Sequence, residues 1–349
     1  MYRSSLTEYN ITKFPWPGYI SDDQLDTVVL KFEQYLNKSC LIITNNVILN
    51  NSIHDGLLKD IIPVNITEDL INSLIKVTPT IECIIIDFSH DIYYFDFELE
   101  RFNNYNLIRP FFILTCNFSY FKKYYNDTKI IFFSFYLLYS NLSIDKFLII
   151  PKKYKFSCLN SRPDTHRRLF YLALSKQQYF SEIMFSFAKD CPRSYDVNLS
   201  KFEHLEFNKL PYPVIIDDNK YLDLTTNHPA YTETYINIVT ESYSYYTLVS
   251  EKTYKPILAG QLFLIVGAVG SIQFLRDIGI DTFDDIIDHS YDQVEDLRER
   301  IELIIKQITY LNNLNLEKIY QLIKPRLIQN SNFLKSDEFI NQFLPLNIQ

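Results

Sequence analysis

The chain has 349 residues, a length that suits two domains better than one core. Its formal net charge of −8 repels polyphosphate at long range, which argues against general nucleic-acid binding. Its five cysteines form no CxxC pair and its six histidines lack metal-ligand spacing, so neither a disulfide framework nor a structural metal site is predicted.

The N-terminal half alternates between helical and strand patterns. Ser21, followed by two acidic residues and an apolar stripe, predicts a capped helix, and a second helix is predicted over 67–77. Continuous apolar runs are typical of strands buried on both faces of a parallel sheet, and they occur at 82–88, 111–115 and 130–135. A short apolar run also lies at 40–44. The alternation predicts an α/β domain.

A proline and a basic cluster at 150–154 interrupt this pattern. We therefore predict an N-terminal domain over 1–152, a second domain over 153–325 and a C-terminal tail over 326–349. The second domain repeats the alternation, with strands expected at 156–159, 235–240 and 262–266 and helices at 167–179, 251–259 and 294–311. Tandem α/β domains favour a ligand in the cleft between them, beyond the carboxyl ends of the strands.

The most informative segment is residues 235–270, YINIVTESYSYYTLVSEKTYKPILAGQLFLIVGAVG. A buried strand is predicted to end at Thr240, with Glu241 just beyond it. Ser250 can cap the following helix, and Gly260 can end that helix before the next strand.

Glu251 and Lys252 would then lie in the first turn of that helix. Free N–H groups there favour phosphate, and Lys252 adds a mobile positive charge. A carboxylate at this place can accept paired hydrogen bonds from ribose or sugar hydroxyls. The same residues also fit an ordinary capped helix with a solvated lysine.

The longer pattern resembles the donor-binding motif of the α-1,3-fucosyltransferases, glycosyltransferase family 10. That motif runs roughly as a strand, Glu-Asn-Ser/Thr, a short loop, Tyr-Val-Thr-Glu-Lys, a helix and an apolar strand that ends in Gly. Its parts correspond without gaps to Glu241-Ser242, Leu248–Lys252 and Phe263–Gly267. Ser242 replaces the usual Asn and Leu248 the usual Tyr, and the second change could alter contacts to the base or sugar of the donor.

A second element, SCLNSRPDTHRRLFYLAL at 157–174, resembles another part of the family pattern. Asn160 follows its strand, and Arg167 takes the position of an arginine that holds the donor diphosphate in the family. A planar guanidinium suits this task through bidentate hydrogen bonds. Arg168 and His166 are neighbours that could substitute, and a solvated helix start is the alternative. The resemblance covers about 156–290, and its last part also resembles uncharacterised family-10-like proteins of phages and large viruses.

The catalytic base is less clearly indicated. The resemblance implies a carboxylate in the N-terminal domain that deprotonates the acceptor hydroxyl. The nearest counterpart is Asn117, whose amide cannot act as a base. Asp87, His90 and Asp91 follow the 82–88 strand, and we take Asp91 and His90 as the catalytic candidates. A turn-capping aspartate and a surface histidine fit these positions equally well.

The resemblance implies a GT-B-like fold, in which two Rossmann-like domains face a central cleft. It implies an inverting glycosyltransferase that needs no metal or other cofactor and moves a sugar, with GDP-fucose as the first expectation, to a glycan acceptor. Arg167 and Lys252 are expected to converge on the donor diphosphate, Glu241 and Glu251 to orient sugar and ribose, and Gly267 to permit a tight turn near the donor.

The expected partners are a nucleotide sugar and a carbohydrate acceptor. With no signal pattern over 1–16 and no apolar run of about 20 residues, neither a membrane span nor export is predicted, so we expect a cytoplasmic protein, in the host cytoplasm if it is viral. One alternative is a catalytically inactive glycan- or nucleotide-binding protein that retains the transferase fold, which Asn117 and Leu248 motivate. Another is a structural viral or phage component.

Overall fold

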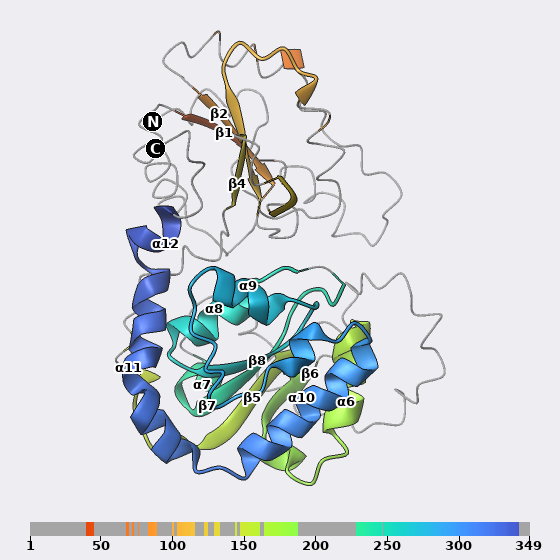
Figure 1. Cartoon of the computed structure of the whole chain (residues 1–349), viewed down its shortest axis with the longest axis vertical. Coiled ribbons are helices and arrows are strands. Elements are labelled where there is room, and N and C mark those ends of the chain that lie inside the picture. The colour runs from red at the N-terminus through yellow and green to blue at the C-terminus, as the bar shows by residue number, and fades with distance from the viewer. Residues whose placement is uncertain are drawn as a thin grey trace. The chain divides into compact units, whose positions relative to one another are not determined.

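The computed structural model describes residues 40–44, 83–88, 103–115, 122–124, 129–132, 147–160, 164–187, 228–245 and 247–341, with the single residues 68, 69, 72, 76, 100 and 144. The chain divides into two compact units, Met1–Leu138 with Ile340–Gln349 and Tyr139–Phe339 (Figure 1). Each unit contains a four-stranded parallel sheet, so the expected α/β class is confirmed. The GT-B-like arrangement, the cleft and the boundaries at 152 and 325 stay predictions.

The sheet of the first unit has its strands in the same order in space as in the chain. They are β1 (Cys40–Thr44), β2 (Cys83–Phe88), β3 (Phe111–Thr115) and β4 (Ile130–Phe132). The parallel register sets Ile84 beside Phe111, and both side chains are buried. β2, β3 and β4 confirm the strands predicted from the runs at 82–88, 111–115 and 130–135, and β1 coincides with the short apolar run at 40–44. The helix predicted after Ser21 lies outside the described residues.

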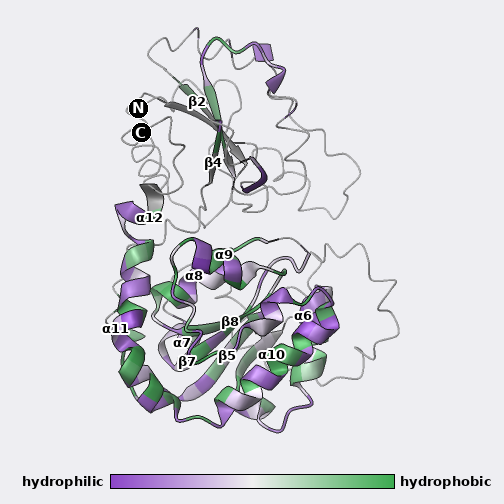
Figure 2. Cartoon of the chain, viewed as in Figure 1, coloured by the Kyte–Doolittle hydropathy of each residue, from purple (hydrophilic) through white to green (hydrophobic). Residues whose placement is uncertain are grey.

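The sheet of the second unit has the order β6-β5-β7-β8. Its strands are β5 (Tyr154–Asn160), β6 (Met184–Phe187), β7 (Thr234–Thr240) and β8 (Leu262–Val266). Every residue of β7 and β8 is buried, because helices cover both faces of a doubly wound sheet. In Figure 2 β8 is coloured as hydrophobic, whereas helices α10 and α11 alternate hydrophobic and hydrophilic residues along their length.

Two of the crossovers in this sheet, from β5 to β6 and from β7 to β8, run in opposite directions. Helix α6 (Thr165–Leu174) links β5 to β6 on one side, and helix α8 (Glu251–Leu258) links β7 to β8 on the other. Since crossovers between parallel strands are right-handed, opposite directions place α6 and α8 on opposite faces. Helix α10 (Leu297–Asn312) packs on α6, and α11 (Leu316–Leu334) packs on α8. The order of the strands therefore reverses between β5 and β7.

Shorter helices complete the described part of this unit. They are α7 (Pro229–Thr232), α9 (Ser271–Asp277) and 3-10 turns at Phe180–Glu182 and Ser290–Gln293. Helix α12 (Asp337–Asn341) begins in this unit, and its last two residues belong to the first. Helix α10 begins three residues later than predicted, because Asp296 caps it by accepting hydrogen bonds from the N–H groups of Arg298 and Glu299. In the described part of the chain, every helix is too short or too polar to span a bilayer.

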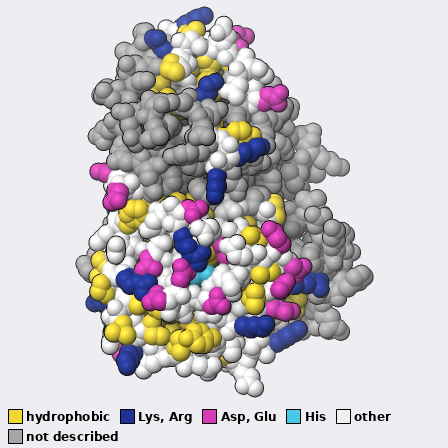
Figure 3. Space-filling view, viewed as in Figure 1, with side chains coloured by type: hydrophobic (Ala, Val, Ile, Leu, Met, Phe, Trp, Pro, Cys, Tyr) yellow, Lys and Arg dark blue, Asp and Glu magenta, His cyan; other side chains and the backbone are white. Residues whose placement is uncertain are grey.

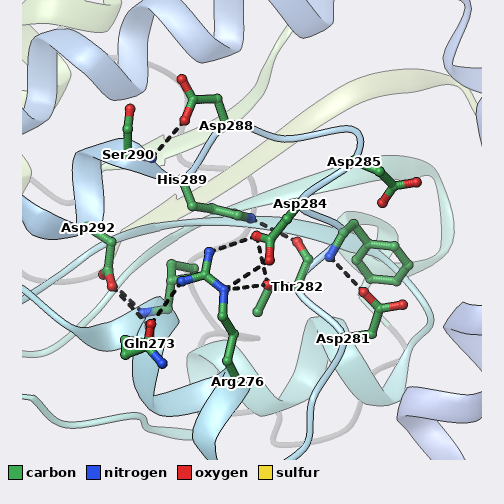
Figure 4. A network of polar contacts seen from close by, with 12 residues as sticks. Gln273, Arg276, Asp281, Thr282, Asp284, Asp285, Asp288, His289, Ser290 and Asp292 are labelled. Atoms are coloured by element: carbon green, nitrogen blue, oxygen red, sulfur yellow. Dashed lines mark hydrogen bonds and ion pairs between the residues drawn. The ribbon is translucent and has the colours of Figure 1, made fainter.

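A network of polar side chains fixes the chain that follows β8 (Figure 4). The buried Asp292 carboxylate accepts hydrogen bonds of 3.0 Å from the N–H groups of Ile272 and Gln273, in the first turn of α9. Arg276, at the other end of α9, pairs with Asp284 at 2.7 Å. A carboxylate therefore already occupies the N-terminus of α9, which closes this helix start to an external anion.

Replacing Asp292 with alanine should lower the free energy of unfolding by about 1–2 kcal/mol, because two N–H groups of α9 lose their acceptor. Urea unfolding followed by circular dichroism measures the change. Asp288→Ala is the matched control: Asp288 is exposed and accepts one hydrogen bond from Ser290, so its loss should cost about 0.5 kcal/mol or less. Equal losses for the two variants would contradict the capping role.

Candidate functional site

The residues predicted to bind a donor gather where the strand order reverses. Asn160 is the last residue of β5, and Thr240 is the last residue of the adjacent β7. The Thr240 hydroxyl donates a hydrogen bond to Asn160 Oδ1, and Asn160 Nδ2 donates to the carbonyl of Ser186 on β6. In open parallel sheets, ligands bind beyond the carboxyl ends of the strands at this kind of switch point.

The Glu241 side chain is the centre of this edge. It is 0% exposed, and its carboxylate accepts four hydrogen bonds. Oε1 accepts from the Ser250 N–H at 3.0 Å and the Thr253 hydroxyl at 2.6 Å. Oε2 accepts from the Ser250 hydroxyl at 2.6 Å and the Ser242 N–H at 3.2 Å. Glu241 therefore ties the end of β7 to the start of α8.

The start of α6 holds the main chain of the same residue. Arg167 Nη2 donates to the carbonyls of Thr240 at 3.2 Å and Glu241 at 3.0 Å, and Nη1 lies 3.2 Å from Asp164 Oδ2. The Glu241 carbonyl also accepts a 2.8 Å hydrogen bond from His166 Nε2. Arg167 is only 1% exposed, so its guanidinium faces these carbonyls and not solvent. The neighbouring Arg168 is half-buried.

The predicted lysine and its neighbouring glutamate are more accessible. Lys252 Nζ lies 2.8 Å from Glu251 Oε1, 3.1 Å from Ser242 Oγ and 3.4 Å from Ser250 Oγ. The Lys252 and Glu251 side chains are 29% and 19% exposed. Burial opposes the charged form of Glu251, but Lys252 and Lys255 outweigh it and hold the pKa of this carboxyl at about 2. Glu251 therefore stays ionised at neutral pH.

Gly267 permits a close approach that the sequence did not predict. A Cβ at this position would lie 3.3 Å from Glu241 Cβ and 3.1 Å from Ile265 Cγ2, so a side chain would press on Glu241. The carbonyl of Gly267 accepts a 2.7 Å hydrogen bond from Arg300, a buried residue of α10. Gly260 has φ +63° and ends α8, as expected.

Arg167, at the start of α6, donates to the Glu241 carbonyl. Lys252, at the start of α8, donates to Ser242 and Ser250, which themselves bond to the Glu241 carboxylate. Sequence reasoning missed Thr253, whose place in the first turn of a capped helix is a usable signal. It also missed the part played by Arg300, for which the pattern gives no signal, because a buried arginine in an amphipathic helix looks like any polar residue. The roles of Lys252 and Arg167 in ligand binding stay predictions.

The predicted catalytic residues and the predicted absence of a metal are not tested by this site. The catalytic candidates His90 and Asp91, and the position of Asn117, lie outside the described residues. Among the described residues, no three His, Cys, Asp or Glu side chains gather closely enough to hold a metal ion. The expectation that the reaction needs no metal stays a prediction.

No family model matches the chain, and no match to a curated protein reaches significance. Among solved structures, the chain is similar to the DNA-modifying enzyme β-glucosyltransferase, whose crystal structure was determined with and without its substrate uridine diphosphoglucose. The identity is 12%, the match covers 75% of this chain and 72% of that chain, and the TM-score is 0.40. A likeness of this extent says nothing about activity, and the family-10 resemblance stays a hypothesis drawn from motifs.

Glu241→Gln should lower the free energy of unfolding by about 3 kcal/mol, because the amide –NH2 would face, in either orientation, a main-chain N–H that needs an acceptor. Thermal and urea unfolding measure the loss. Glu299→Gln, at an exposed position in the first turn of α10, makes the same chemical change and should stay within about 0.5 kcal/mol of the wild type. A stable Glu241→Gln variant would show that the four hydrogen bonds contribute little.

The ionisation of Glu251 gives a second test. Because its folded pKa of about 2 lies below the ordinary value of 4.5 for a glutamate, the carboxylate stabilises the fold above about pH 4.5 and loses this effect as pH falls through 2. The carboxyl carbon resonance of Glu251 should therefore hardly move between pH 7 and pH 4. In Lys252→Ala it should shift over this range, since the main opposing charge is gone. Identical titrations in both proteins would exclude Lys252 as the cause.

Proposed function

We propose that the second unit binds a nucleotide sugar at the switch point between β5 and β7, and that the protein is an inverting glycosyltransferase that works without a metal. The observation that carries this proposal is the position of the partly exposed Lys252 ammonium at the carboxyl edge of the sheet. This ammonium bonds to Ser242 and Ser250, and both serines bond to the buried Glu241 carboxylate. Such an arrangement places an ammonium group, paired with Glu251, where doubly wound sheets bind phosphorylated ligands.

Lys252 is the group that would meet the donor diphosphate. The rival helix start, that of α9, already holds the Asp292 carboxylate. On the face shown in Figure 3, the acidic and basic side chains of the described residues of this unit are interspersed, so these residues form no broad positive patch there that would attract an anion. Local contact with the ammonium is therefore the main attraction, and it would also stabilise the diphosphate as it leaves the sugar.

Neighbouring groups suit the remaining parts of a nucleotide. The Glu251 carboxylate, close to Lys252, can accept hydrogen bonds from ribose or sugar hydroxyls. In the loop after β7, the rings of Tyr243 and Tyr245 lie 5.6 Å apart, and Tyr245 is 66% exposed. An exposed aromatic ring offers a face on which a base can stack. GDP-fucose remains the first donor to test, because of the family-10 motif.

Arg167 would support the donor through the main chain. Its guanidinium orders the carbonyls of Thr240 and Glu241, and so the loop that carries Ser242. Direct contact with the diphosphate, which the resemblance implies, would require this guanidinium, now only 1% exposed, to become accessible to the ligand. In this proposal Arg167 is a positioning residue in the ligand-free protein.

A nucleotide-binding protein without turnover is the second candidate. Asn117 at the expected position of the base and Leu248 in place of a motif tyrosine favour it. Hydrolysis or transfer from a bound nucleotide sugar would exclude it, whereas donor binding without turnover on a panel of glycan acceptors would support it.

Lys252→Ala should weaken the binding of GDP or of the matching sugar nucleotide by about 10- to 100-fold, as expected for the loss of a charge-assisted contact to phosphate. Isothermal titration calorimetry in metal-free buffer measures the affinities, and Lys252→Arg should keep part of the binding. Lys306→Ala, at an exposed position on α10, controls for net charge and should bind as the wild type does. Failure of the wild type to bind any GDP- or UDP-linked ligand would refute the proposal.

A further inference from the structure

All three donor directions of the Lys252 ammonium are occupied by groups of the chain itself. Its partners are the Glu251 carboxylate at 2.8 Å and the hydroxyls of Ser242 and Ser250 at 3.1 and 3.4 Å. An ammonium has three N–H donors, so an arriving phosphate must replace at least one partner. A bare anion therefore meets a cation that a neighbouring carboxylate has already neutralised.

Of these three partners, Glu251 is the charged one, and it is the partner that an arriving phosphate repels. The Ser250 hydroxyl is buried and bonded to Glu241 Oε2, and the Ser242 N–H is bonded to the same oxygen. Glu241 therefore holds the Ser250 hydroxyl directly and fixes the main chain of Ser242. The Glu251 side chain is partly exposed, and a carboxylate and a phosphate beside one ammonium repel each other. Phosphate binding should therefore move the Glu251 carboxylate away from Lys252.

We propose that Glu251 is a specificity residue that selects nucleotides over inorganic phosphates by competing with the ligand for Lys252. The inference rests on the proposed function and explains how that site would distinguish nucleotides from inorganic phosphates. Pyrophosphate must displace a charged carboxylate and has few or no donors to offer it at neutral pH. A nucleoside diphosphate carries ribose hydroxyls near its phosphates, and the displaced carboxylate can accept hydrogen bonds from them. The low pKa of Glu251, about 2, keeps the competitor charged at neutral pH.

Calorimetric titration of the full chain with pyrophosphate, GDP and UDP in metal-free buffer tests this inference. In Glu251→Gln, the affinity for pyrophosphate should rise about 10-fold, as for release of one charge-assisted contact, while that for the nucleotide stays equal or falls. The preference for nucleotide over pyrophosphate should then fall by about 10-fold or more. Glu299→Gln makes the same change of charge at an exposed position of α10 and should leave both affinities within about twofold.

Glu251→Asp is the second variant, because it keeps the charge but shortens the reach to Lys252. It should give an intermediate preference, and it keeps the test valid if Glu251→Gln does not fold. Nucleotide binding with an unchanged affinity for pyrophosphate in both variants, or equal changes for both ligands, would overturn this inference and leave the proposed function standing. Failure of the wild type and both variants to bind any of the three ligands would overturn both.

Discussion

The candidate site depends on one buried charge, the carboxylate of Glu241. A carboxylate without exposure is tolerated only when donors replace the water that it loses, and here two main-chain N–H groups and two hydroxyls do so. Three of these four donors belong to Ser250 and Thr253, at the start of α8. The position of α8, and with it of Lys252, is therefore set by how Glu241 is satisfied.

This constraint explains several otherwise separate features. Gly267 has no side chain because Glu241 passes within contact distance of it. Arg167 and His166 reach across from α6 to the Glu241 carbonyl, which orients the residue from the side of β5. The edge of the sheet is thus a set of polar groups that largely satisfy one another, and Lys252 and Glu251 form its more exposed part.

A site of this kind is suited to selection more than to strong attraction. Arg167 is neutralised by Asp164 and Lys252 by Glu251, so a ligand gains little from net charge alone. It must offer groups that replace the internal partners it displaces. That requirement favours a ligand with both phosphate and hydroxyl groups, and it is the physical reason why we place a nucleotide sugar here.

The sequence by itself determined the local elements. Continuous apolar runs predicted β2, β3, β7 and β8 nearly to the residue, and Ser250 and Gly260 marked the start and end of α8, because caps and buried strands depend on neighbours in the chain. Glu241, Ser250 and Lys252 could also be predicted to lie close together, because only one loop and the first turn of α8 separate them along the chain. The short strand β6 and helix α9 were not predicted.

Only the tertiary structure decided what these residues do to one another. Arg167 and Glu241 are 74 positions apart, and they meet because β5 and β7 pair in parallel, a choice that no local pattern encodes. The fold turned the Arg167 guanidinium inward onto carbonyls, filled the α9 start with Asp292 and buried Glu241 completely. Polar groups that lose water on burial must find hydrogen-bond partners within the protein. Packing, and not spacing along the chain, decides which distant groups become those partners.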